Sequence, residues 1–383
     1  MTSLRQIEIF GVEVPLAGPG FKNAYITKRS QKSAVVRITD SDGHVGLGNI
    51  DPSPGYSTET IDQSLDALDQ TLAPAALNQD PHNVHALMGR LAAAQPGFLD
   101  AKAAIEMACM DLMGRRSGLS VATLMGGPVR DQFRLNAWIG IVSPDEAAAE
   151  AMKWHEKGWR SAKIKVGGGV KADADRVRAV REAVGPDFAI RVDANAGYSV
   201  DEGLELGRLL EPYALELMEQ PVAADDLNGL ARVRSGVSMP VMADESVTDY
   251  ASLLSLIRSN AVDLVKLKVM KQGGFLQASR MLATAEAAGL KVVVGHGFGL
   301  GVNTMAELLF SSTSHAVVDG LECVGPIKTT DDIVEHKLDM TSGSIRLSFP
   351  PGIGVALDEK KLACYTFSHR VITPNAFVLS KYP

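Results

Sequence analysis

Two lysines stand one residue apart in the apolar segment SAKIKVG, residues 161–167. Because side chains alternate faces along a strand, Lys163 and Lys165 would point the same way if this segment is a strand. Two ammonium groups on one face repel each other unless something holds them there. The pair therefore marks this segment as a candidate for chemistry.

Further charged or polar residues follow at the ends of later apolar runs, in steps of 24 to 30 residues. They are Asp193, Glu219, Asp244, Lys268, His296 and Glu322. Each step is about one strand–helix unit long. In a closed barrel of such units the carboxyl ends of all strands meet at one mouth, where the active site lies. The spacing predicts that these side chains converge.

Three of these residues are carboxylates: Asp193 in VDAN, Glu219 in MEQP and Asp244 in ADES. Carboxylates on adjacent strands repel, and a hard divalent cation such as Mg²⁺ resolves the repulsion by accepting oxygen ligands. A single acidic residue at a strand end is more often the N-cap of the next helix. Three in succession favour a metal site.

The lysines can then lie on both sides of this metal site. Lys163 and Lys165 belong to the second barrel strand and Lys268 to the sixth, and these strands face each other across a barrel of eight. A lysine near other cations and partly desolvated has a lowered pKa and can act as a base. An opposite lysine that stays protonated can act as an acid. The alternative is that the lysines only form salt bridges with the carboxylates.

Eight short apolar runs alternate with helical stretches after residue 127, which predicts a parallel sheet. The runs are LNAWIGI, SAKIKVG, FAIRVDAN, LELMEQP, PVMADES, VDLVKLKV, LKVVVGHG and VVDGLECVG. Their charged carboxyl ends favour a closed β/α barrel, with an open doubly wound sheet as the alternative. Before them, two antiparallel strand segments with a turn at Asp42-Gly43 and an amphipathic helix over 100–118 predict an α+β module.

Composition narrows the classes of function. The chain has 383 residues, 46% hydrophobic and 22% charged, with a net charge of −7 and no basic block, which argues against nucleic acid as a partner. No apolar run reaches the length of a membrane span, and the amino terminus lacks the apolar core of a signal peptide. The three cysteines, Cys109, Cys323 and Cys364, have no metal-binding spacing. We expect a cytoplasmic protein with a small-molecule substrate.

Taken in order, these motifs resemble the enolase superfamily, and within it the muconate lactonizing enzyme subgroup, over nearly the whole chain. The matching segments are AKAAIEMACMDLMGRRSGLSVATLMGG, KIK at 163–165, DAN at 193–195, EQP at 219–221, ADES at 243–246 and LKVMKQGG at 267–274. The resemblance implies a modified (β/α)₇β barrel with a capping domain built from both chain ends. The expected boundaries are 1–127 for the capping domain, 128–325 for the barrel and 326–383 for the segment that returns to the cap.

The resemblance also implies roles for the residues. Mg²⁺, with Mn²⁺ as a substitute, would be bound by the three carboxylates, with Asn195 and Glu245 near the metal. Lys165 and Lys268 would be the acid/base pair, and Lys163 would stabilise the enolate. The shared chemistry is proton transfer at the carbon α to a carboxylate through an enediolate whose charge Mg²⁺ stabilises. Homo-oligomers, dimers or octamers, are typical of the family.

Substrate specificity is expected from two capping-domain loops, 17–30 and 49–60, and from the last strands. Tyr56, followed by Glu59, and Glu322 before Gly-Pro resemble muconate cycloisomerases. His296 and Phe298 depart from that pattern, because small residues are expected there. His296 is either a substrate contact or a hydrogen-bonded residue of the wall.

Three functions remain open on these grounds. A muconate-type cycloisomerase leads. A racemase or epimerase of an amino-acid derivative is the second, with an acid dehydratase of the same superfamily close to it. Dipeptide epimerases are disfavoured, because they carry Asp-x-Asp where this chain has Glu322-Cys323-Val324. A non-catalytic binding barrel is the third.

Overall fold

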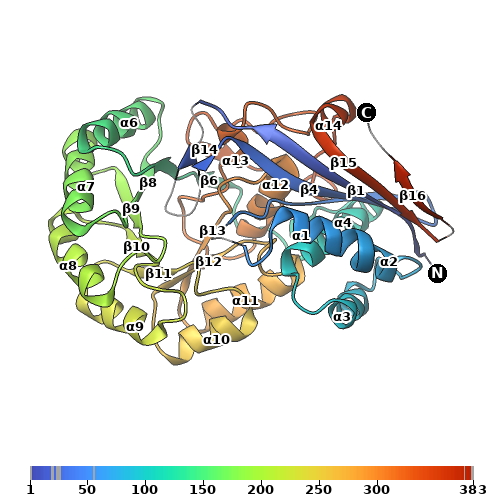
Figure 1. The fold of residues 1–383 in the computed structure, drawn as a ribbon, viewed down its shortest axis with the longest axis horizontal. Coiled ribbons are helices and arrows are strands. Elements are labelled where there is room, and N and C mark those ends of the chain that lie inside the picture. The colour runs from blue at the N-terminus through green and yellow to red at the C-terminus, as the bar shows by residue number, and fades with distance from the viewer. Residues whose placement is uncertain (1, 19–20, 23–26, 55–56, 375, 381–383) are drawn as a thin grey trace.

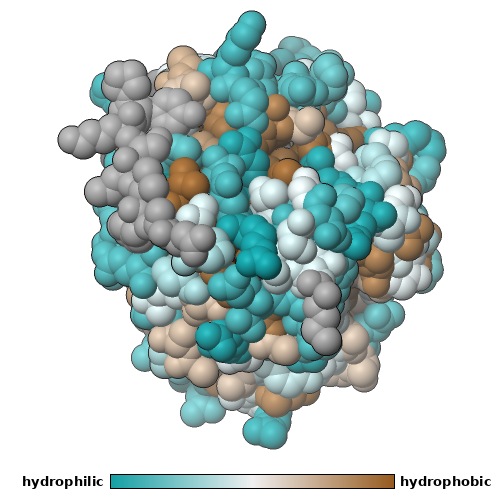
Figure 2. Space-filling view, turned by 90° about the vertical axis from the view of Figure 1, so that its right-hand side faces the viewer, coloured by the Kyte–Doolittle hydropathy of each residue, from teal (hydrophilic) through white to brown (hydrophobic). Residues whose placement is uncertain are grey.

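The computed structural model describes residues 2–18, 21–22, 27–54, 57–374 and 376–380. A five-stranded antiparallel sheet lies beside a parallel sheet of seven strands that is wrapped by helices (Figure 1). On the face shown in Figure 2, hydrophobic residues lie interspersed among hydrophilic ones. Within the described residues, no helix combines the length and the apolar character that crossing a membrane requires.

The antiparallel sheet joins both ends of the chain. Its strands, in the order β16-β15-β1-β4-β5, are β16 (Ala376–Ser380), β15 (Thr366–Thr373), β1 (Leu4–Pro15), β4 (Ser30–Asp40) and β5 (Val45–Ile50). β4 and β5 form the predicted hairpin, and Gly43 in its turn has a φ of 86°. β15 pairs with β1, with Ile372 opposite Ile7. The capping domain is therefore built from both chain ends, as the sequence predicted.

Helices cover one face of this sheet. They are α1 (Ile61–Ala67), α2 (Ala73–Ala76), α3 (Val84–Ala94) and α4 (Leu99–Ser117); the π-helical turn η1 (Leu68–Leu72) joins α1 to α2, and the short α5 (Val121–Leu124) follows α4. α4 ends at Gly118 in a left-handed conformation, as predicted. The prediction that this helix is amphipathic was wrong. It is buried on nearly all sides, because it lies between the sheet and the barrel. Its buried Asp111 accepts a hydrogen bond from the backbone N–H of Leu47 in β5, and its buried Glu106 accepts one from Phe275 on the barrel side.

The backbone of β5 lies directly on the backbone of α4, and this contact requires glycine. A Cβ atom on Gly48 would lie 1.9 Å from the carbonyl oxygen of Ala104. We expect Gly48→Ala to lower the free energy of unfolding by about 1–3 kcal/mol, measured by urea denaturation. Gly89→Ala in α3 is the control: a Cβ there meets no atom within 4 Å, so it should be neutral or stabilising. Equal effects of the two variants would contradict the close packing.

Seven parallel strands form most of the barrel. In sheet order they are β13 (Lys291–Val294), β12 (Leu264–Leu267), β11 (Val241–Ala243), β10 (Leu217–Glu219), β9 (Ala189–Asp193), β8 (Ser161–Lys165) and β7 (Ala137–Ile139). Each coincides with one of the predicted apolar runs.

The eighth run, residues 317–325, closes the barrel without forming a regular strand. Val317 bridges to Val292 of β13, and Leu321 bridges to Leu135 just before β7. The fully buried Arg191 side chain of β9 donates to the carbonyl oxygens of Asp319 and Gly320, each at 2.7 Å. The closed barrel is confirmed, and the open doubly wound alternative was wrong.

The outer helices follow the strands in turn. They are α6 (Pro144–Glu156), α7 (Val170–Val184), α8 (Val200–Leu210), the 3₁₀ turn η2 (Glu211–Tyr213), α9 (Leu227–Gly236), α10 (Tyr250–Arg258), α11 (Phe275–Ala287), α12 (Gly301–Ser311) and the short α13 (Gly325–Lys328). Capping boxes start several of them: Ser143 with Glu146 at α6, and Ser199 with Glu202 at α8.

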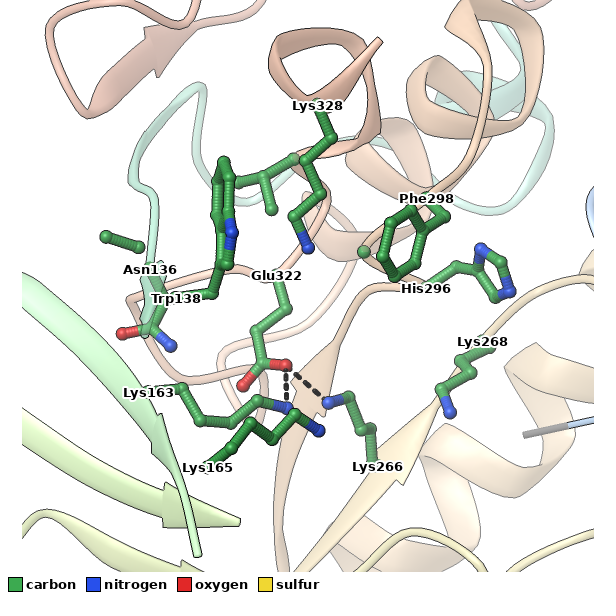
Figure 3. A pocket seen from close by; sticks show the side chains of 13 residues that line it. Asn136, Trp138, Lys163, Lys165, Lys266, Lys268, His296, Phe298, Glu322 and Lys328 are labelled. Atoms are coloured by element: carbon green, nitrogen blue, oxygen red, sulfur yellow. Dashed lines mark hydrogen bonds and ion pairs between the residues drawn. The ribbon is translucent and has the colours of Figure 1, made fainter. Parts of the chain in front are cut away.

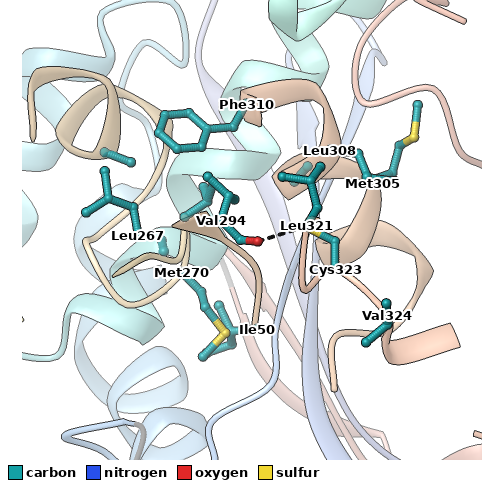
Figure 4. Close-up of a cluster of buried hydrophobic side chains, with 14 of the residues drawn as sticks. Ile50, Leu267, Met270, Val294, Met305, Leu308, Phe310, Leu321, Cys323 and Val324 are labelled. Carbon is teal, nitrogen blue, oxygen red and sulfur yellow. Dashed lines mark hydrogen bonds between the residues drawn. The ribbon is translucent and has the colours of Figure 1, made fainter. Parts of the chain in front are cut away.

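Two contacts fix the capping domain on the barrel. The buried Glu106 of α4 accepts hydrogen bonds from the backbone N–H groups of Phe275 and Leu276 at 2.9 Å, and so caps α11. Ile50, at the end of β5, lies next to Met270 after β12 in the buried cluster of Figure 4. These contacts hold α4 on the start of α11 and the end of β5 beside the segment that follows β12.

The rest of the chain forms short elements. They are β2 (Phe21–Lys22), β3 (Thr27–Lys28), β6 (Gln132–Arg134), β14 (Ser344–Arg346) and α14 (Glu359–Tyr365). β14 pairs with β6, the segment that leads into the first barrel strand. The boundaries expected at residues 127 and 325 stay predictions.

Candidate active site

The carboxyl ends of the barrel strands surround one pocket, and four of the five lysines that line it come from two strand ends (Figure 3). Lys163 and Lys165 come from β8, while Lys266 and Lys268 come from β12 and the residue after it. The wall is completed by Asn136, Ala137, Trp138, His296, Gly297, Phe298, Glu322, Val324 and Lys328.

Two of the three predicted metal ligands are register partners. Glu219 of β10 lies opposite Asp193 of β9, and both side chains are fully buried. The Lys163 ammonium bridges them, with Nζ 3.1 Å from Asp193 Oδ2 and 2.9 Å from Glu219 Oε2. Asp244 follows β11 and is also fully buried; it accepts hydrogen bonds from Lys268 Nζ at 2.7 and 2.8 Å.

The electrostatics of these carboxylates fit a cation site. Burial and the charge of Asp193 raise the pKa of Glu219 to about 7, although Lys163 and Lys266 act in the opposite direction. Burial also disfavours ionised Asp193, but the neighbouring lysines outweigh it and lower its pKa to about 2. Three buried carboxylates on adjacent strands are hard oxygen donors that suit Mg²⁺. The residues present therefore fit a divalent cation.

The oxygen atoms of the three carboxylates lie farther apart than the ligand atoms of a preformed metal site would. Within the described residues, the set of three candidate ligand atoms within 4.8 Å of one another is Asp40, Asp42 and His44, at the exposed β4–β5 turn. There Arg116 already forms ion pairs with Asp40 and Asp42. At the barrel mouth, each carboxylate is instead bonded to lysines.

Glu322 is bonded to lysines rather than presented alone to the pocket (Figure 3). Its Oε2 accepts from Lys163 Nζ at 2.5 Å and from Lys266 Nζ, and Arg191 Nη1 lies 3.7 Å from its Oε1. Burial raises the pKa of Glu322, but these cations outweigh it and hold the pKa well below its usual range. Its expected contact with substrate stays a prediction.

Lys266 was missed by the sequence reasoning, although its signal was present. It precedes Lys268 by two residues, as Lys163 precedes Lys165, so the same alternation of strand faces identifies it. Lys266 Nζ also lies 3.1 Å from Glu219 Oε1. The two lysine pairs face each other across the pocket.

Lys165 belongs to a chain of polar contacts at the ends of β8, β9 and β11. Its Nζ donates to Asp193 Oδ2 at 2.6 Å and to Asn195 Oδ1 at 2.8 Å. Asn195 Nδ2 in turn donates to Glu245 Oε1 at 3.1 Å. Asn195 has a φ of 46°, in the left-handed region that is strained for most residues. Asn195 and Glu245 thus lie beside the carboxylates, and Asn195 holds the Lys165 ammonium; their expected place near a metal stays a prediction.

The pKa values of two lysines are raised by the carboxylates that they contact. Burial lowers the pKa of Lys268, but Asp244 outweighs this effect and the net pKa is raised. Burial likewise acts against Lys163, while Asp193, Glu219 and Glu322 raise its pKa well above the usual range. The lowered pKa expected for the lysine that acts as the base stays a prediction.

Gln220, the middle residue of EQP, fixes the positions of two neighbouring strand ends. Its Oε1 accepts from the backbone N–H groups of Asp244 and Ser246, both at 3.1 Å, and its Nε2 donates to Ser246 Oγ at 2.7 Å. Gln220 has a φ of 35°. This strained, buried residue holds Glu219 and Asp244 in place, and the sequence reasoning gave it no role.

His296 lies in the pocket wall above Lys268. Its backbone N–H donates to Glu307 Oε2 at 2.9 Å, whereas neither ring nitrogen has a hydrogen-bond partner in the described part of the chain. Burial and the charges of Lys268 and Lys28 keep its pKa well below the usual range. The expected substrate contact of His296 stays a prediction.

Trp138 and Phe298 lie on either side of the Lys328 side chain (Figure 3). Lys328 Nζ lies 4.3 Å from the centroid of each ring, and Lys28 Nζ lies 4.6 Å from that of Phe298. Lys28 comes from the predicted specificity loop 17–30. Neither Lys28 nor Lys328 was identified from the sequence, because neither lies at the carboxyl end of a predicted barrel strand.

The second predicted specificity loop is only partly described. Tyr56 lies outside the described residues. Glu59 accepts from the backbone N–H groups of Asp100 at 2.8 Å and Ala101 at 3.2 Å, so it caps α4.

Comparison with known proteins agrees with this arrangement. Residues 5–126 match the mandelate racemase / muconate lactonizing enzyme N-terminal domain, and residues 146–361 match the enolase C-terminal domain-like family. The N-succinyl-L-Arg/Lys racemase of Bacillus cereus is 33% identical over 93% of this chain and 96% of its own. Its crystal structure superposes with a TM-score of 0.93, covering 97% of this chain and all of the other.

Two further relatives carry out different reactions. Muconate cycloisomerase 1 of Pseudomonas putida is 31% identical over 92% of this chain and 95% of its own. The structure of a dipeptide epimerase from Cytophaga hutchinsonii, complexed with Mg and the dipeptide D-Ala-L-Val, has a TM-score of 0.91 and 26% identity and covers 97% of this chain and all of the other. The family models, the fold and these relatives agree: the chain is an isomerase of the enolase superfamily.

Proposed function

We propose that this protein is a Mg²⁺-dependent racemase or epimerase of an N-acylated α-amino acid. The substrates in the names of two relatives, N-succinyl amino acids and dipeptides, share an α-carbon between a carboxylate and an amide nitrogen. The cycloisomerase that led the sequence predictions is not singled out, because muconate cycloisomerases are one group of relatives among several. Mn²⁺ substitution, homo-oligomeric assembly and a cytoplasmic location stay predictions.

The observation that carries this proposal is the placement of two lysines on opposite sides of one pocket. Lys165 ends β8 and Lys268 follows β12, four strands away in the sheet order. Each is bonded to a different carboxylate, Asp193 and Asp244. Inverting an α-carbon requires removal of a proton from one face and its return on the other, so a base on each side is the required arrangement.

The residues of the pocket have different roles in the proposed reaction. One lysine takes the α-proton and the other returns a proton to the opposite face; the roles exchange for the other enantiomer. When bound, Mg²⁺ supplies Lewis-acid stabilisation of the substrate carboxylate. Lys163 and Lys266 lie beside Glu219 and provide further positive charge where negative charge develops on the carboxylate oxygens. Glu322 holds both of these ammonium groups in position.

The test is α-proton exchange by the purified enzyme with Mg²⁺ in D₂O. We expect N-succinyl amino acids or dipeptides of either configuration to lose optical purity and gain one deuterium at the α-carbon, followed by mass spectrometry and chiral separation. cis,cis-Muconate is included in the same assay. Conversion of muconate to a deuterated lactone, with no exchange in any N-acyl amino acid, would return the assignment to the cycloisomerase, and loss of water would indicate a dehydratase.

A further inference from the structure

Asn136 is a buried residue in the wall of the pocket, immediately before β7. It is 2% exposed, and its backbone N–H donates to the carbonyl oxygen of Leu321 at 2.8 Å. Asn136 and Trp138 point to the same face, because they are two residues apart, and Trp138 is the register partner of Lys163. Asn136 therefore faces the inside of the barrel, on the wall that also carries Trp138 (Figure 3).

The carboxamide of Asn136 has no hydrogen-bond partner in the described part of the chain. Both Oδ1 and Nδ2 are buried and unpaired. An amide buried in this state costs free energy, because the hydrogen bonds that it makes with water in the unfolded chain are not replaced. Asn49 shows the usual arrangement: it is fully buried, yet its Nδ2 donates to two carbonyl oxygens and its Oδ1 accepts from a backbone N–H. The unpaired amide of Asn136 indicates that its partner is a bound molecule.

Hydrogen-bond acceptors are scarce in this pocket, whereas donors are abundant, because five lysines line it. Among the described residues of its wall, the side chains that can accept are those of Asn136, His296 and Glu322. Glu322 Oε2 already accepts from two lysines, and its Oε1 lies 3.7 Å from Arg191 Nη1. His296 lies on the other side of the pocket, above Lys268. Asn136 Oδ1 is therefore the acceptor that the β7 side of the pocket offers to a ligand.

We infer that Asn136 Oδ1 accepts a hydrogen bond from the amide N–H of the substrate and so selects an amide over an ester. This inference rests on the proposed function, because that function places an amide nitrogen on the α-carbon. The carbonyl oxygen of the same amide finds donors among the lysines, whereas its N–H needs one of the few acceptors. An ester has an oxygen atom in place of the N–H, and the lone pairs of that oxygen would face those of Oδ1.

The experiment compares two ligands of equal size that differ in one hydrogen-bond donor. N-acetylglycine carries the amide N–H, and acetoxyacetate has an ester oxygen in its place. Both have a short acyl group and no side chain, so other preferences of the pocket cannot decide the result. Binding is measured by calorimetry with Mg²⁺ on the wild-type enzyme, on Asn136→Leu, which removes the acceptor, and on Asn136→Asp, which keeps an acceptor oxygen at the same place.

We expect the wild type to bind N-acetylglycine about 10- to 100-fold more tightly than acetoxyacetate. Asn136→Leu should remove this preference by weakening the binding of the amide alone, and Asn136→Asp should keep the preference. Equal affinities in the wild type, including no detectable binding of either ligand, would overturn the inference. A preference that survives in Asn136→Leu, or one that is lost in folded Asn136→Asp, would overturn it as well.

The stability of the free protein gives a readout that does not depend on turnover. Asn136→Leu should leave the melting temperature unchanged or raise it, because leucine has a similar size and needs no hydrogen bond. Asn49→Leu is the matched control and should lower the melting temperature, because it leaves the backbone groups that Asn49 binds without their partner. If Asn136→Leu lowers the melting temperature as much as Asn49→Leu, or does not fold, the amide is already paired in the free protein and the inference fails.

Deuterium exchange at the α-carbon of N-acetylglycine in D₂O separates this inference from the proposed function. Exchange together with equal affinities for the two ligands would keep the racemase assignment and remove the role of Asn136. An Asn136-dependent preference in binding without exchange would remove the racemase assignment and leave the amide contact standing.

Discussion

Glu219→Gln is expected to weaken Mg²⁺ binding more than about 100-fold and to abolish turnover. The change keeps the size of the side chain and removes its charge. Glu219 is the central one of the three carboxylates, with Asp193 opposite it on β9 and with Lys163 and Lys266 bonded to it. Both lysines keep an anionic partner in Glu322, so the variant should fold.

A second glutamate on the same strand segment gives the control. Glu216 lies three residues earlier, near the opposite end of the barrel, where its Oε2 accepts from Arg191 Nε at 2.6 Å. Glu216→Gln should therefore leave Mg²⁺ affinity unchanged, whatever its cost in stability. The measurement is calorimetric titration with Mg²⁺, supported by the rise in melting temperature that Mg²⁺ produces in each protein. Unchanged affinity in Glu219→Gln would remove Glu219 from the metal site.

Much of the fold follows from periodic features of the sequence. The alternation of apolar runs and helical stretches located all seven regular barrel strands, because buried parallel strands read as short apolar runs. The eighth run was found for the same reason, yet it closes the barrel through isolated bridges and through the carbonyl oxygens that Arg191 binds. The burial of α4 on nearly all sides could not be read from its own residues, since its charged side chains bond to distant backbone groups such as those of α11.

The candidate site likewise contains residues that the sequence predicts and residues that it does not. Residues at strand ends were predictable, because one register rule brings Asp193, Glu219 and Asp244 to the same edge. Lys328 was not, because it lies on a short helix after the last barrel strand and faces Trp138, 190 residues away in the chain, only through tertiary packing. The sign of the lysine pKa shifts also depends on individual contacts, such as that of Lys268 with Asp244, which spacing does not provide.

Replacing either Lys165 or Lys268 by alanine is expected to lower racemisation about 10²- to 10⁴-fold, the range of a lost general acid or base. The two variants should differ in exchange. Each enantiomer presents its α-proton to one lysine, so each variant should still exchange the enantiomer that faces its remaining lysine. In D₂O, Lys268→Ala and Lys165→Ala should therefore incorporate deuterium into opposite enantiomers without inversion.

This opposite selectivity distinguishes a pair of bases from a general loss of positive charge. Both lysines are buried and bonded to carboxylates, so either alanine variant leaves Asp193 or Asp244 with fewer cationic partners. A purely electrostatic role would lower exchange for both enantiomers in both variants, and that outcome would contradict the two-base mechanism. Lys291→Ala, at the exposed opposite end of β13, controls for the loss of a lysine from the barrel and should leave both reactions unchanged. Exchange confined to one enantiomer in each variant would assign each lysine to a face of the α-carbon, because only a positioned base can make that distinction.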